Sequence, residues 1–237
     1  AEADAVTRQE QEAFARRESF WLKDYALHRA LSDALGTRNW RTWPLGLRDR
    51  RPSALRQAAE DLRVERDAEV HAQFLFHRQW RRLQTCAREA GILLLGDLPI
   101  YVHPDGADTW AHRAVFDLSP GGGALRRVAG VPPDYFAQDG QRWGNPLYRW
   151  WTPEGRLCPQ TLRWWQARLR KGLKDVDWLR VDHFRAFESF WSIPARSATA
   201  RAGRWRRGPG AAFFQAMPAG GKLPLLAEDL GMITPGV

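Results

Sequence analysis

The stretch Trp178-Leu179-Arg180-Val181-Asp182-His183-Phe184-Arg185 decides the fold, because it joins a short apolar strand to charged side chains. Side chains alternate along a strand, so Arg180 and Asp182 project to the same side. A permanent cation beside a carboxylate keeps it ionised and fixes its orientation. Such an aspartate at the carboxyl end of a buried strand suits a nucleophile or a ligand-orienting anion. A structural ion pair at a strand end would give the same local pattern.

A second apolar run ends in acids further along the chain. Residues 223–228 read Leu-Pro-Leu-Leu-Ala-Glu, and Asp229 follows Glu228. Two acids at the ends of neighbouring parallel strands would form the carboxylate pair that glycoside cleavage needs, one to attack and one to exchange a proton. The alternative is that Glu228 caps the next helix or binds a backbone amide. The spacing alone leaves both interpretations open.

A third apolar run, Ile92 to Leu95, predicts a parallel strand buried on both faces and followed by Asp97. Before it, apolar residues recur at helical spacing over about 7–35, 53–64 and 70–90. The sequence therefore predicts an α/β fold: a helical subdomain over residues 1–90 and a strand-containing domain over 91–237.

The segment 103–154 reads as a long irregular loop rich in glycine and proline. Loops of this length usually cover or bind something. Within it, residues 130–148 place aromatic rings beside Asp, Gln, Asn and Arg. Sugars stack their C–H faces on such rings and need hydrogen bonds for their hydroxyls. The alternative is a proline-rich loop held in place by buried aromatic rings.

The composition excludes several classes of protein. The chain has 237 residues, is 44% hydrophobic and carries a formal net charge of +9. No basic tail, finger spacing or aromatic RNA-binding signature accompanies that charge, so we expect no nucleic-acid partner. No apolar run is long enough to span a membrane. Two cysteines, Cys86 and Cys158, cannot build a disulfide framework or a zinc site, which fits a reducing cytoplasm. Cys86 lies in an apolar helical stretch, and its thiol is expected to be buried by packing.

Four ordered motifs resemble those of the amylomaltases, the 4-α-glucanotransferases or disproportionating enzymes of glycoside hydrolase family 77 in the α-amylase superfamily. The resemblance covers nearly the whole chain, and the 130–148 segment is its most specific part. The motifs are Gly96 to Val102, Gly130 to Tyr148, Arg180 to Arg185 and Ala227 to Gly231.

The resemblance implies a (β/α)8 barrel with its active site at the carboxyl ends of the strands. Asp182 would be the nucleophile and Glu228 the general acid/base, supported by Arg180 and His183. No metal or cofactor is implied, and the substrate would be an α-1,4-glucan. The implied substrate-binding residues are Asp97, Tyr135, Phe136, Gln141, Trp143, Asn145 and Pro146.

The resemblance also implies a barrel start before residue 1 and a third catalytic carboxylate beyond residue 237. About three of eight strands are expected here, with residues 1–90 inserted between barrel strands. We therefore expect a middle fragment that is inactive when made alone. An α-glucan hydrolase or a non-catalytic glucan-binding fragment remain the alternatives, and a nucleic-acid binder is the weakest one.

Overall fold

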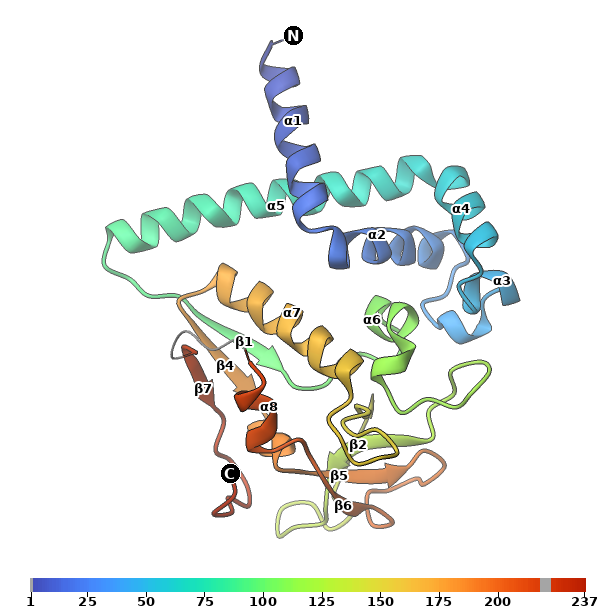
Figure 1. The fold of residues 1–237 in the computed structure, drawn as a ribbon, viewed down its shortest axis with the longest axis vertical. Helices are drawn as coiled ribbons and strands as arrows, with labels where there is room; N and C mark the ends of the chain where they lie inside the picture. The colour runs from blue at the N-terminus through green and yellow to red at the C-terminus, as the bar shows by residue number, and fades with distance from the viewer. Residues whose placement is uncertain (1, 218–222) are drawn as a thin grey trace. The chain divides into compact units, whose positions relative to one another are not determined.

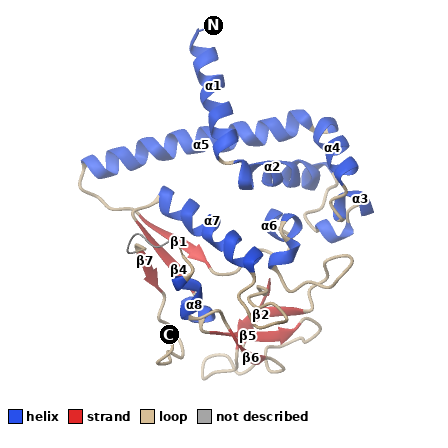
Figure 2. Cartoon of the chain, in the orientation of Figure 1, coloured by secondary structure: helices blue, strands red, loops and turns tan. Residues whose placement is uncertain are grey.

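The computed structural model describes residues 2–217 and 223–237, which form helices and two β-sheets (Figures 1 and 2). In chain order the elements are α1 (Glu2–Arg17), α2 (Ser19–Ala34), η1 (Trp40–Thr42), α3 (Leu45–Arg48), α4 (Pro52–Asp61), α5 (Arg63–Glu89), β1 (Leu95–Pro99), α6 (Ala107–Ala111), η2 (Arg113–Val115), β2 (Arg127–Val131), β3 (Gln141–Pro146), α7 (Pro159–Asp175), β4 (Trp178–Asp182), η3 (Phe184–Phe187), β5 (Ser189–Pro194), β6 (Arg204–Arg207), α8 (Ala211–Gln215) and β7 (Leu225–Ala227).

The chain divides into two compact units. The first contains residues 1–86 and 105–111, and the second contains residues 87–104 and 112–237. The first unit is helical. Its single predicted helix over 7–35 is two helices, α1 and α2, because the chain turns at Glu18. The buried Glu18 carboxylate accepts a hydrogen bond of 2.9 Å from the Trp21 indole, which holds this turn.

The first unit has apolar contacts at two places. Phe14, Leu22 and Phe74 form one buried cluster from α1, α2 and α5. The other is an aromatic group in which the centre of the His28 ring lies 5.1 Å from that of Trp43 and 5.7 Å from that of Trp110. Phe14 and Phe74 are thus core, as their helical spacing predicts, whereas Phe20 and Phe76 are exposed. Cys86 departs from the prediction: it is exposed, because it lies outside the buried stripe of α5.

The second unit contains a three-stranded parallel sheet in the order β1-β4-β7. The prediction for β1 is wrong in position. The strand covers 95–99, whereas Ile92 and Leu93 are exposed connector residues. The reason lies in the register. The Leu94 carbonyl accepts hydrogen bonds from the backbone N–H groups of Asp177 and Trp178. The paired part of the strand therefore begins at Leu95. Asp97 therefore lies in the middle of β1 and not at its end.

The second sheet is antiparallel, with the order β3-β2-β5-β6. Two of its strands, β2 and β3, lie inside segment 103–154, which is therefore not the irregular loop that its composition indicates. The reason is long-range pairing: β2 is held by β5, more than 50 residues away in the chain. Buried Val128, Ile193 and Ala200 form the apolar cluster of this sheet.

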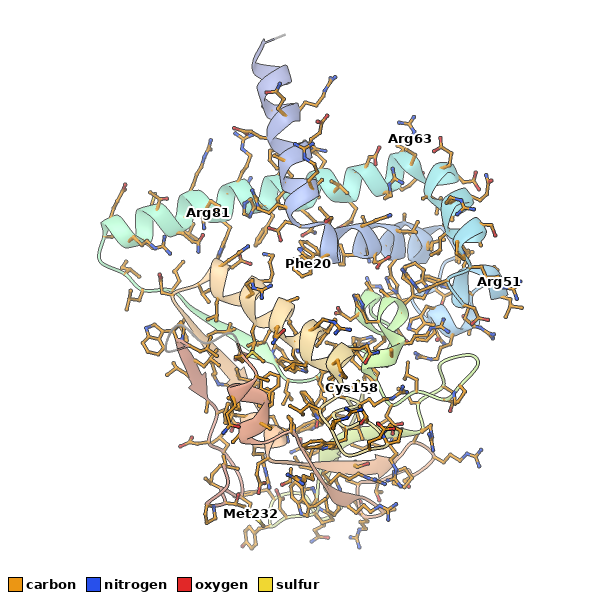
Figure 3. The ribbon with its side chains drawn as sticks, viewed as in Figure 1. Phe20, Arg51, Arg63, Arg81, Cys158 and Met232 are labelled. Carbon is orange, nitrogen blue, oxygen red and sulfur yellow. The ribbon has the colours of Figure 1, made fainter. Side chains whose placement is uncertain are left out.

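Helix α7 contacts β1 and β4 and fixes their ends (Figure 1). The Arg168 guanidinium donates to the carbonyl of Pro99 at 2.7 Å and to that of Ile100 at 3.1 Å. The Trp165 ring, which is fully buried, lies 5.3 Å from Tyr148 and 5.3 Å from Phe187. Buried Cys158 precedes the helix (Figure 3). These contacts order the residues that follow β1 and β4, where the predicted site lies.

Candidate active site at the ends of the parallel strands

Arg180 joins two carboxylates on adjacent strands. Its Nη1 lies 2.5 Å from Asp97 Oδ1, and its Nη2 lies 2.7 Å from Asp182 Oδ1. The strand register explains this geometry, since Asp97 is directly opposite Arg180 and Asp182 is two residues further along β4. Hydrogen bonds from Asp97 and Asp182 raise the pKa of Arg180 above its ordinary value. The predicted pairing of Arg180 with Asp182 is present, and Asp97 extends it.

Glu228 lies beside the end of β4. Its backbone N–H donates to the Val181 carbonyl at 3.2 Å, one step beyond the Val181–Ala227 pair of the sheet. Glu228 Oε2 accepts the backbone N–H of His183 at 3.1 Å, and Oε1 accepts that of Leu230 at 2.6 Å. The carboxylate thus binds backbone amides, as the alternative interpretation expects. The amide of His183 follows Asp182 directly. The hydrogen bond from this amide to Glu228 therefore keeps Glu228 and Asp182 at neighbouring strand ends.

His183 turns the chain sharply after Asp182. Its backbone is left-handed, with φ 51° and ψ 44°, an uncommon conformation for a residue with a Cβ. Its side chain is buried, and burial, together with the cation of Arg185, lowers the pKa of His183 to about 4. The imidazole is therefore neutral near pH 7. The turn leaves Asp182 half-exposed at the end of the strand.

The 141–146 strand carries four of the predicted sugar-binding residues and reaches this end of the parallel sheet. The Trp143 ring meets His183 edge to face at 4.8 Å, and its Nε1 donates to Gln141 Oε1 at 3.0 Å. Asn145 Nδ2 donates to the Val102 carbonyl at 2.9 Å, just after β1. Trp143 remains 38% exposed, so part of its indole is open to a ligand. Pro146 is buried at the end of β3.

Tyr135 and Phe136 are not brought into contact with the acids. They are 96% and 95% exposed and meet each other edge to face at 5.8 Å. The side chain of Asp134 caps this turn by accepting the backbone N–H groups of Phe136 and Ala137 at 2.9 and 2.7 Å. Two exposed rings on one turn form a surface that can stack on a ligand.

Tyr101 is a neighbour of the site that the sequence reasoning missed. Its buried ring stacks on Tyr148 at 6.1 Å and lies 6.4 Å from His183. Burial raises the pKa of its hydroxyl above the ordinary value. Its position two residues after β1, next to the carboxyl end of a parallel strand, is the signal that could have identified it.

A metal-binding cluster and a membrane-spanning helix are both absent from the described residues, 2–217 and 223–237. No group of three or more His, Cys, Asp or Glu side chains in this part of the chain could hold a metal ion. No helix within it is both long and apolar enough to cross a membrane.

Comparison with known proteins gives one consistent family. The sequence model of the 4-alpha-glucanotransferase family matches residues 1–237. The 4-alpha-glucanotransferase of Thermus thermophilus is 48% identical over 99% of this chain and 47% of its own length. That of Synechocystis is 43% identical over 99% of this chain and 46% of its own length. This chain therefore spans about half the length of these relatives.

A solved structure agrees with the sequence matches. The amylomaltase of Streptococcus agalactiae, solved in complex with acarbose, aligns with a TM-score of 0.86 and 31% identity. The alignment covers 96% of this chain and 45% of that one. The mixed α/β structure, with its parallel sheet and helices, is thus similar to that of an amylomaltase. The chain belongs to the 4-alpha-glucanotransferase family.

Proposed function

We propose that the protein containing this chain is a 4-α-glucanotransferase, which transfers a segment of an α-1,4-glucan to a new 4-hydroxyl with retention of configuration. The observation that carries this proposal is the pair of acids at adjacent parallel strand ends, where Glu228 accepts the N–H of the residue after Asp182. Family membership supports it independently.

Asp182 is the proposed nucleophile. Its carboxylate attacks the anomeric carbon of the donor, and the bond from that carbon to the leaving oxygen breaks. Arg180 holds Oδ1 of Asp182, which leaves Oδ2 for the attack. The product of this step is a glycosyl ester on Asp182.

Glu228 is the proposed general acid/base. In its protonated form it gives its proton to the leaving oxygen. In its ionised form it takes the proton of the acceptor 4-hydroxyl, whose oxygen attacks the anomeric carbon of the ester. Asp182 is then released as a carboxylate and Glu228 regains its proton. His183 supports both steps, since its backbone N–H binds Glu228 and its neutral ring carries no competing charge.

Seven residues are proposed to bind the glucan. The partly open Trp143 indole and the exposed rings of Tyr135 and Phe136 would stack on glucose units. Gln141, Asn145 and Asp97 would hydrogen-bond hydroxyls, and Pro146 would shape the wall beneath them. Acarbose, the ligand of the S. agalactiae amylomaltase, is consistent with a glucan at this site.

The proposal extends to the architecture. We propose that β1, β4 and β7 are part of a (β/α)8 barrel, that helical residues 1–90 are an insertion in it, and that segment 103–154 covers the substrate. The free thiols of Cys86 and Cys158 suit a cytoplasmic location.

The test is product analysis with maltotriose and the full protein. A glucanotransferase releases glucose and builds maltopentaose and longer chains. A hydrolase of the same superfamily would give glucose and maltose with no product longer than the substrate. Binding of maltotriose without any product would instead support a glucan-binding protein, and either result would overturn the proposal.

A further inference from the structure

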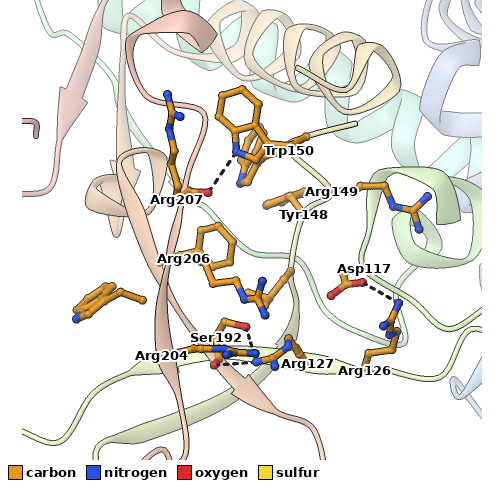
Figure 4. A pocket seen from close by; sticks show the side chains of 14 residues that line it. Asp117, Arg126, Arg127, Tyr148, Arg149, Trp150, Ser192, Arg204, Arg206 and Arg207 are labelled. Atoms are coloured by element: carbon orange, nitrogen blue, oxygen red, sulfur yellow. Dashed lines mark hydrogen bonds and ion pairs between the residues drawn. The ribbon is translucent and has the colours of Figure 1, made fainter. Parts of the chain in front are cut away.

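A pocket lies in the unit that contains both sheets, and neither proposed catalytic acid lines it (Figure 4). It has a volume of about 680 Å³ and is built mainly from the antiparallel sheet and the segment after β3. Six of its lining residues are arginines: Arg126, Arg127, Arg149, Arg204, Arg206 and Arg207.

Strand register places three of these arginines on one face of the sheet. Arg204 is opposite Ser192 and Arg206 is opposite Phe190, and residues two apart on a strand share a face. Arg127 on β2 reaches the same face, where its Nη1 lies 3.3 Å from Ser192 Oγ. Figure 4 shows these three side chains near Ser192, with dashed lines from Arg127 to it.

The other arginines of the pocket are engaged elsewhere. Arg207 lies over the Trp151 ring at 5.0 Å, Arg149 donates to the Phe116 carbonyl at 3.3 Å, and Arg126 pairs with Asp117 at 3.9 Å. Asp117 is the one acid among the described residues that line the pocket. Positive charge is therefore concentrated around Arg127, Arg204 and Arg206.

The neighbouring positive charges affect Arg127. Burial and the neighbouring cations of Arg206 and Arg204 lower the pKa of Arg127. Like charges this close repel one another, and the repulsion favours an anion between them. Arg204 and Arg206 are exposed, and they stand over a floor that contains buried Phe190 and Ser192.

We propose that this pocket binds a phosphate group, with Arg127, Arg204 and Arg206 holding its oxygens. The guanidinium fork matches the geometry of phosphate oxygens and donates two hydrogen bonds at once. A pocket of this volume has room for a hexose next to the phosphoryl group. The phosphoryl group would come from inorganic phosphate or from a sugar phosphate.

The experiment is calorimetric titration of the full protein with inorganic phosphate and with glucose 6-phosphate, at constant ionic strength set by chloride. The pocket variant is Arg204→Gln/Arg206→Gln. The matched control is Arg156→Gln/Arg196→Gln, which removes two exposed arginines of the same unit that do not line the pocket. A third variant, Arg204→Lys/Arg206→Lys, keeps the charge and removes the fork.

The wild type and the control are expected to bind with the same dissociation constant, and the glutamine variant is expected to bind at least about tenfold more weakly. The lysine variant should fall between them, and it provides the comparison if the glutamine variant does not fold. Tighter binding of glucose 6-phosphate than of phosphate identifies a sugar phosphate as the ligand, and equal binding identifies inorganic phosphate.

Absence of binding to the wild type, or an equal loss of affinity in the control, would overturn the proposal. Maltotriose disproportionation without phosphate should be the same in the wild type and the pocket variant. The phosphate site and the proposed transferase activity can therefore fail separately.

Discussion

Arg180 is the residue that links the two strands at the candidate site, because it binds both Asp97 and Asp182. Its link to Asp182 could be read from the sequence, since residues two apart on a strand share a face. Its link to Asp97 could not, because it depends on the register between two strands more than 80 residues apart. Local pattern predicts which side chains share a face, while pairing decides which strands meet.

Asp182→Asn is expected to abolish glucan transfer while preserving the fold. The amide still offers an oxygen to Arg180 but cannot form the glycosyl ester, so turnover should fall by at least about a thousandfold. Maltotriose disproportionation and the melting temperature are measured together. Asp175→Asn, which breaks an ion pair with Lys171 on α7, is the control and should keep wild-type turnover. Activity of Asp182→Asn within tenfold of wild type would contradict the assignment.

Tyr135→Ala is expected to weaken maltooligosaccharide binding by about 1 kcal/mol, because a stacking surface is removed. Its ring is 96% exposed, so the melting temperature should not change. Trp143→Ala should lower both affinity and melting temperature, since its ring also packs on His183. Phe20→Ala, an exposed ring of the helical unit, controls for a general effect (Figure 3). Unchanged affinity in Tyr135→Ala would mean that this turn does not touch the glucan.

His28 makes the stability of the helical unit depend on pH. Burial lowers its pKa from 6.5 to about 4 in the folded state. Above pH 6.5 the ring is neutral in both states, and its contribution to stability is complete. As the pH falls from 6.5 towards 4 the unfolded chain binds a proton that the folded chain does not, so stability is lost, by a few kcal/mol at most.

His28→Gln should therefore flatten the fall in the free energy of unfolding over this interval, measured by urea denaturation at each pH. His71→Gln, on the exposed face of α5, is the control and should leave the slope as in the wild type. The same slope in His28→Gln and the wild type would show that His28 is not the cause.

At the scale of the elements, the strands that carry the proposed acids were predictable and the segment between β1 and α7 was not. The runs at 178–182 and 223–228 end in acids and match β4 and the region of β7. The run at 92–95 misplaced β1, since apolar character alone does not show where pairing begins. The strands β2 and β3 were hidden among glycines and prolines, because their hydrogen-bond partners are distant or irregular.

Gly130, the glycine of β2, is expected to tolerate no side chain. A Cβ at this position would lie 2.1 Å from the Gln141 carbonyl oxygen and 2.5 Å from Ile193 Cδ1. Neither the backbone of β3 nor the buried isoleucine can move away easily, so Gly130→Ala should cost about 3 kcal/mol of stability.

Gly155→Ala is the comparison variant. Gly155 has a φ of +78°, and an added Cβ would meet open space. The substitution should therefore lower stability only through backbone strain, by about 1 kcal/mol. Both values come from urea denaturation, and hydrogen exchange shows whether the loss is confined to the antiparallel sheet. An equal cost in the two variants would mean that β2 and β3 are not held this closely.

At the scale of the whole molecule, family membership and the position of two acids point to the same function. The chain is a member of the 4-alpha-glucanotransferase family and spans about half the length of its relatives. Its parallel strands place Asp182 and Glu228 at neighbouring ends, and the segment around Trp143 reaches the same end of the sheet. The central claim is that these features form a retaining transferase site with Asp182 as its nucleophile.

The most direct test is to trap the glycosyl ester on the full protein. A fluorinated α-glucosyl donor that reacts quickly in the first step and slowly in the second makes the ester accumulate, and protease digestion with tandem mass spectrometry locates it. One fluoroglucosyl mass is expected on the peptide at Asp182, absent from Asp182→Asn and longer-lived in Glu228→Gln. A fluoroglucosyl ester on Asp97 or on any other residue would contradict the central claim.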